Sequence, residues 1–208
     1  MIELFGSALV TFLVIIDPPG CAPIFASLTR DTTLAHRRSM AIRSSLIAWA
    51  VLMFFGLLGR PMLEALGISL ASFRIAGGVM LFIIALDMVF ERRTQRRESR
   101  AQSIEGTPEA EDISVFPMAI PMIAGPGSIA SAMLWVSRTD DAVEVATVLA
   151  AITVVILLTL LALLAAGPIM RLVGPKIEAM ITRILGVILA ALAAQFIVDG
   201  VKQSFPSL

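Results

Sequence analysis

The sequence predicts an all-α membrane protein with six transmembrane helices. We expect two inverted three-helix repeats, with helices 1 and 4 broken near the bilayer midplane. Of the 208 residues, 58% are hydrophobic and 15% are charged, whereas soluble domains have about 45–50% and about 25%. Six apolar stretches have about the 20 residues that one bilayer crossing needs. Prolines and glycines also recur in the same order in both halves of the chain.

The six expected spans account for most of the chain. They cover residues 4–28, 42–59, 68–90, 113–136, 143–166 and 181–201. Because this apolar surface is too large for one buried core, we expect it to face a lipid bilayer. We divide the chain into a first repeat at 1–90, a cytoplasmic connector at 91–112 and a second, inverted repeat at 113–208.

The connector is the longest polar stretch, and it begins with arginines at positions 92, 93, 96, 97 and 100. We interpret it as solvated and mobile, and its basic run as a topology signal rather than a binding site. Twelve of the sixteen lysines and arginines lie in the connections between spans one and two, three and four, or five and six, or at the span ends beside them. Because basic residues favour the cytoplasmic side, we predict a multi-pass protein of the cell inner membrane with both termini in the periplasm. This orientation requires that each interrupted span crosses once.

Composition excludes several classes of function. The formal net charge is zero, so the chain offers no basic field for nucleic acid. Cys21 is the only cysteine and His36 the only histidine, so we expect no disulfide bond, no metal site and no cofactor. There is no phosphate-binding loop of the Walker type. We predict that the chain is not an enzyme, since an intramembrane enzyme would need converging reactive groups and the spans offer only Asp17.

The two halves share an ordered series of residues, mainly prolines and glycines that interrupt or end helices. Each half has three spans, so the second half enters the membrane from the opposite face, as in many secondary transporters. At an offset of 107 residues, and of 109 after a two-residue insertion, the matches are Pro19-Gly20 with Pro126-Gly127, Pro61 with Pro168, Gly67 with Gly174, Arg74-Ile75 with Arg183-Ile184, and Gly77 with Gly186.

Spans one and four carry breaks at matching positions, and these are the candidate substrate-binding residues. The first break holds Asp17, Pro18, Pro19, Gly20, Cys21, Ala22 and Pro23, and the second holds Gly125, Pro126, Gly127 and Ser128. Prolines remove backbone donors and should unwind the chain, and the freed groups must line an enclosed cavity rather than lipid. Helix N-termini suit a carboxylate, and helix C-termini suit an ammonium group or a cation. We therefore predict a small zwitterionic solute there; the alternative is that the breaks are only packing kinks.

Asp17 is the most unusual ionisable residue, because it lies about 13 residues into an apolar span. Such a residue is costly in a membrane and is usually functional. It is our candidate for coupling to protons or sodium, or for the ammonium group of the substrate. A structural role, in which it accepts backbone N–H groups across the break, is an equal alternative. Asp87 and Asp199 lie near span ends, and we expect them to reach the interface.

Two motifs carry a resemblance to a known family. They are Ile16-Asp17-Pro18-Pro19-Gly20-Cys21-Ala22-Pro23-Ile24-Phe25 and Ile120-Pro121-Met122-Ile123-Ala124-Gly125-Pro126-Gly127-Ser128-Ile129. With these motifs, the chain resembles the MarC family, also called the small neutral amino acid transporter family, although Cys21 stands where the family often has asparagine. The resemblance implies six spans in inverted repeats and import of glycine, alanine or similar amino acids. It also implies that the substrate sits between the two broken helices, largely on backbone groups.

The sequence therefore predicts a secondary transporter of small neutral amino acids or similar small metabolites, coupled to a cation gradient. An exporter or passive channel of the same fold is one alternative, and a non-transporting membrane scaffold is another. Small-residue stretches such as 190–194 would suit helix contacts within one protomer or in a homodimer.

Overall fold

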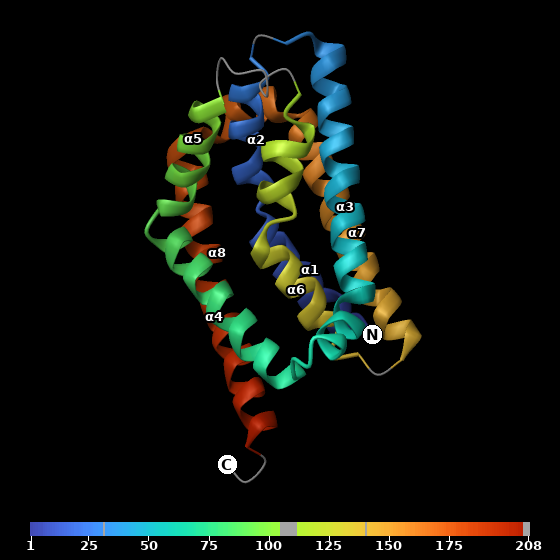
Figure 1. The fold of residues 1–208 in the computed structure, drawn as a ribbon. Coiled ribbons are helices and arrows are strands. Elements are labelled where there is room, and N and C mark those ends of the chain that lie inside the picture. Colours follow the sequence, from blue (N-terminus) through green and yellow to red (C-terminus); the bar gives the residue numbers. More distant parts are fainter. Residues whose placement is uncertain (31, 105–111, 140, 206–208) are drawn as a thin grey trace.

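A computed structural model describes residues 1–30, 32–104, 112–139 and 141–205, and the elements in these ranges are helices (Figure 1). Five helical stretches are long and apolar enough to cross a membrane. A bent pair of helices makes a sixth if the pair is counted as one span. The chain is thus an all-α membrane protein with five to six candidate spans, which confirms the predicted fold class at this level.

The first half contains four helices. They are α1 (Ile2–Ile16), α2 (Pro18–Leu28), α3 (Leu34–Ala65) and α4 (Leu70–Val89). The hydroxyl groups of Thr33 and Ser69 accept a backbone N–H and so cap α3 and α4. Helices α1 and α2 follow each other along one span of 27 residues. They are separated only by Asp17, whose φ of 59° and ψ of 67° are left-handed.

The expected unwinding of the first break from Asp17 to Pro23 is wrong. Pro18 and Pro19 occupy the first turn of α2, where the missing N–H groups have no helical partner to lose. Pro23 lies inside the same helix. One left-handed residue is therefore enough to interrupt this span, and the prolines begin the next helix instead of melting it.

The described residues after α4 form one helix in the connector and then the helices of the second half. They are α5 (Arg92–Ile104), η2 (Ser114–Ile123), α6 (Pro126–Val136), α7 (Ala142–Leu164) and α8 (Ala166–Ser204). The π-helix η2 contains non-helical dihedral angles at Phe116 and Ile120, the residues before its two prolines. It meets α6 at a bend of 54°. The polar connection expected before span six is itself helical, because α8 begins at Ala166.

The two broken spans lie inside the bundle. In the apolar window of α1 and α2, 72% of the residues are buried, against 28–39% in the other four candidate spans. Helix α7 packs on α1 and α2, while α3 packs on η2 and α6. Helices α4 and α8 pack extensively against each other. Large apolar side chains on the outer faces of these helices are exposed, as expected for contact with lipid.

Glycines bring α4 and α8 close together. A Cβ atom added to Gly78 would lie 2.9 Å from the carbonyl oxygen of Ala193, and one added to Gly200 would lie 2.9 Å from that of Ala71. Small residues at such a contact let two helix backbones approach. Ala193, from the small-residue stretch that the sequence singled out, is thus used within the protomer.

We expect Gly78→Ala to lower the free energy of unfolding by about 1–3 kcal/mol, because the added methyl group meets backbone atoms of α8 that cannot rotate away. Thermal unfolding of the purified protein in detergent measures the effect. Gly6→Ala is the matched control, since no atom lies within 4 Å of its added Cβ. Equal stability of the two variants would contradict this account of the α4–α8 contact.

Candidate functional site

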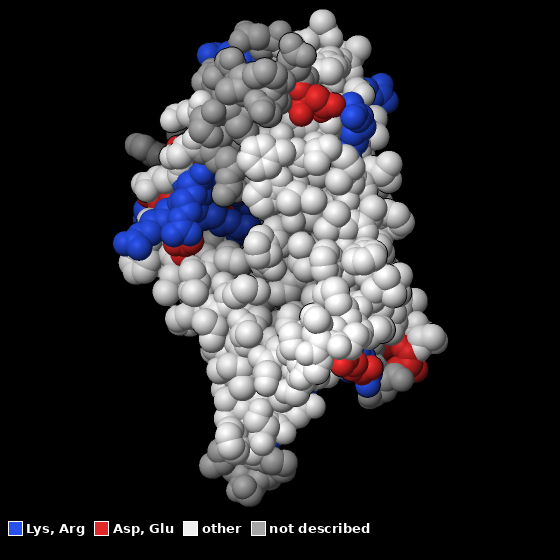
Figure 2. Space-filling view, in the orientation of Figure 1, with Lys and Arg blue, Asp and Glu red and all other residues white. Residues whose placement is uncertain are grey.

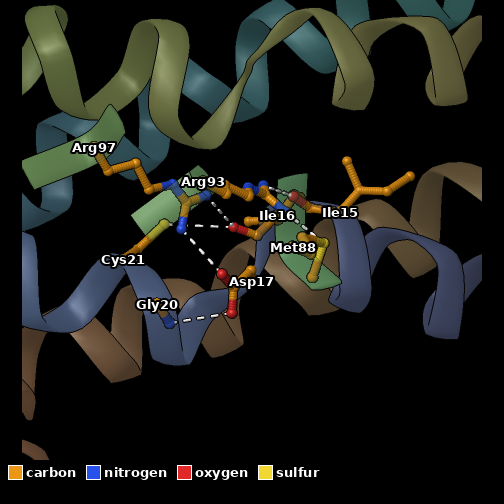
Figure 3. A network of polar contacts seen from close by, with 8 residues as sticks. All are labelled: Ile15, Ile16, Asp17, Gly20, Cys21, Met88, Arg93 and Arg97. Carbon is orange, nitrogen blue, oxygen red and sulfur yellow. Dashed lines mark hydrogen bonds and ion pairs between the residues drawn. The ribbon is translucent and has the colours of Figure 1, made fainter. Parts of the chain in front are cut away.

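Asp17 lies in the gap between α1 and α2 and holds both sides of it together. One carboxylate oxygen accepts a hydrogen bond from the backbone N–H of Gly20 at 3.1 Å, which caps α2. The other pairs with the guanidinium of Arg97 at 3.0 Å (Figure 3). Asp17 therefore has the structural role that the sequence left open, and its role in coupling stays a prediction.

Arg97 comes from α5, which lies in the connector. Its side chain is 8% exposed and that of Asp17 is 3% exposed, so the ion pair is buried. Arg97 also donates a hydrogen bond to the carbonyl of Ile16 at 3.3 Å. The interpretation of the basic run as a solvated topology signal is wrong for this residue. Helix α5 packs against α4 and α2 and contributes to the interior.

Arg93 lies one turn before Arg97 on α5, and it too reaches the end of α1. It donates hydrogen bonds to the carbonyl of Ile15 and, at 3.1 Å, to the sulfur of Met88 (Figure 3). Burial and the neighbouring charge of Arg97 lower the pKa of Arg93 to about 10, so it stays protonated at neutral pH. The sequence predicted that the carbonyls at this helix end would face a solute. Instead, they accept hydrogen bonds from arginines of the same chain.

Asp87 also belongs to this region. It is 9% exposed and pairs with Arg96. The sequence contained a signal for this cluster: 93 and 97 are four residues apart and so share one face of a helix. Figure 2 shows arginine and acidic side chains of this region gathered in one patch on a face with few other charges.

The second break repeats one contact of the first. The Ser128 hydroxyl donates a hydrogen bond to the carbonyl of Ile123 at 2.9 Å, and the Cys21 thiol donates to that of Ile16 at 3.4 Å. These two contacts are 107 residues apart, which is the offset found in the sequence. One difference matters for binding. The N-cap residue of α6 is Gly125, which has no side chain to cap it, whereas Asp17 caps α2.

A cavity of about 270 Å³ opens between α5 and the second break. Its polar lining is Asp87, Arg93, Arg96 and Arg97; its apolar lining is Ile15, Ile84, Pro121 and Met122; and the start of α6 contributes Gly125, Pro126, Gly127 and Ser128. All four candidate residues of the second break thus meet at this cavity. The candidates of the first break, from Asp17 to Pro23, are not part of its lining.

The cavity suits a small anionic group. Two of its three arginines are paired with carboxylates, which leaves the charge of Arg93 without a paired carboxylate among the described residues. The N-terminus of α6 adds partial positive charge and unpaired N–H groups. A volume of about 270 Å³ is slightly below the roughly 300–1,000 Å³ typical of ligand pockets, which favours a small ligand.

The sequence matches one protein family along almost its whole length. The family is described as MarC family integral membrane protein, and the match covers residues 2–205. A UPF0056 membrane protein of Archaeoglobus fulgidus is 32% identical over 207 residues, covering 100% of this chain and 96% of the relative. A second, from Methanocaldococcus jannaschii, is 35% identical over 201 residues, covering 97% of each chain.

A bacterial relative agrees with these archaeal matches. The UPF0056 inner membrane protein YhgN of Escherichia coli is 32% identical over 196 residues, covering 94% of this chain and 95% of the relative. No solved structure matches the chain. The resemblance that the two break motifs indicated is confirmed: the chain belongs to the MarC family of integral membrane proteins.

Proposed function

We propose that the protein is a secondary transporter of small neutral amino acids or similar small metabolites across the inner membrane, coupled to a cation gradient. The cavity at the second break carries this proposal. It places the N-terminus of α6 and Arg93, which suit a carboxylate, in one small space with Asp87, which suits an ammonium group. A small zwitterion matches both poles.

We also propose that the two halves are inverted repeats. The equivalent hydrogen bonds of Cys21 and Ser128 support this relation. The packing is reciprocal too, since α7 covers the first broken span and α3 covers the second. The start of α1 and the end of α8 lie toward one end of the molecule, and α5 lies toward the other (Figure 1). With the basic connector in the cytoplasm, this arrangement favours periplasmic termini.

Uptake of radiolabelled glycine and alanine into proteoliposomes tests the proposed function. We expect accumulation that depends on an imposed proton or sodium gradient and stops when an ionophore collapses it. Liposomes without protein give the background, and size-exclusion chromatography with protease accessibility shows that the protein is folded and inserted. Absence of uptake by folded, inserted protein would contradict import of these amino acids and would favour export, another solute or a scaffold role.

A further inference from the structure

Arg93 differs from the other two arginines of the cavity in its partners. Arg97 pairs with Asp17, and Arg96 pairs with Asp87. Arg93 donates to a carbonyl and to a thioether, and it has no paired carboxylate in the part of the chain that the structure describes. An arginine carries five N–H donors, and these two contacts engage two of them. Among the described residues, its charge thus has no carboxylate in an ion pair with it, and Asp17 and Asp87 attract it only as neighbouring charges.

At the first break, one carboxylate contacts both the start of a helix and an arginine of α5. Asp17 accepts the N–H of Gly20 at the start of α2 and pairs with Arg97 of α5. At the offset of 107, position 124 holds alanine, so the second break lacks that carboxylate. The start of α6 nevertheless lines the cavity beside Arg93, which lies one helical turn from Arg97.

We propose that Arg93 binds the carboxylate of the transported solute. This carboxylate binds at the N-terminus of α6, as the carboxylate of Asp17 does at the N-terminus of α2. The site therefore requires a carboxylate on its ligand. Loss of the ammonium group costs less than loss of the carboxylate, because Asp87 is shared with Arg96 through one of its two oxygens. The cavity then accepts small monocarboxylates as well as small amino acids. This inference deepens the proposed function and rests on it for the identity of the site.

Competition with wild-type protein tests the ligand class without any mutation. Propionate is alanine without its ammonium group, and alaninamide is alanine without its carboxylate. We expect propionate, but not alaninamide, to inhibit uptake of radiolabelled alanine and to raise the melting temperature of the protein in detergent. Equal effects of the two compounds would overturn the requirement for a carboxylate.

Variants of Arg93 test its assignment as the residue that binds the carboxylate. We expect Arg93→Gln to raise the alanine concentration for half-maximal uptake about 10- to 100-fold, as expected for a lost hydrogen bond to a charged group. Arg93→Lys should recover part of the loss, because it keeps the charge but not the fork of donors. Arg92→Gln is the matched control, since Arg92 is an exposed neighbour on the same helix. An Arg93→Gln protein that takes up alanine like wild type would overturn the assignment.

The two measurements separate this inference from the proposed function. If wild-type protein transports alanine but alaninamide competes as well as propionate, transport stands and the role of Arg93 falls. If it transports neither amino acid but propionate raises its melting temperature, and Arg93→Gln removes that shift, the carboxylate site stands and amino acid transport falls. If propionate leaves uptake and melting temperature unchanged, the inference fails whatever the variant does.

Discussion

Asp17→Asn is expected to release α5 from the bundle and to destabilise the protein. Asparagine keeps an oxygen for the Gly20 N–H, so the cap of α2 survives. It removes the counter-charge of Arg97, whose side chain is 8% exposed. Removing one partner of a buried ion pair typically costs about 3–5 kcal/mol, because the other charge stays buried without compensation. Trypsin cleavage within the arginine-rich α5 should become faster, since release exposes its backbone.

A double-mutant cycle measures this coupling. Asp17→Asn and Arg97→Met are each expected to lower the melting temperature strongly, whereas the double variant should recover much of the loss because no unpaired charge remains. The matched control is the exposed pair of Arg60 and Glu64, whose charged atoms lie 3.1 Å apart. Glu64→Gln should change stability by less than about 1 kcal/mol. Additive effects of the Asp17 and Arg97 variants would show that the pair does not hold α5 in place.

The sequence predicted the overall architecture because hydrophobic length and helix-breaking residues act locally. Each long helix contains an apolar stretch, and the two interruptions fall at Asp17 and Gly125, where proline and glycine cluster. The extent of each break was harder to predict. Pro18 and Pro19 are compatible with either an unwound segment or a first helical turn, and the choice depends on the single left-handed residue before them.

The docking of α5 does not follow from local pattern, since it depends on contacts 80 residues apart. Nothing local distinguishes Arg97, which is buried against Asp17, from Arg92, which is exposed. The spacing of Arg93 and Arg97 predicts a shared helix face but not its partner. A buried aspartate in a span requires a compensating group, however, and the basic connector was the richest source of cations. Joining these two observations would have suggested the ion pair.

Gly125→Ala is expected to disrupt the second break. Gly125 has a φ of −82°, which suits any residue, so the penalty is steric rather than conformational. A Cβ atom there would lie 2.5 Å from the carbonyl oxygen of Pro121, a backbone atom that moves only if η2 shifts against α6. We expect a loss of about 1–3 kcal/mol in stability. Alanine uptake should fall by about 10-fold or more, because roughly 1.4 kcal/mol of lost binding already gives that factor.

The neighbouring Gly127 provides the contrast that distinguishes a transport site from a packing kink. A Cβ atom on Gly127 would come within 2.5 Å of the end of the Ile84 side chain, which can rotate away. Gly127→Ala should therefore keep near-wild-type stability, and Gly6→Ala, at a helical position with space for a Cβ, should neither lower stability nor change uptake. Uptake and melting temperature, measured together for these variants, distinguish a transport site from a packing kink. If Gly125→Ala lowers stability but leaves uptake intact in the folded fraction, the break is a packing feature and the solute passes elsewhere.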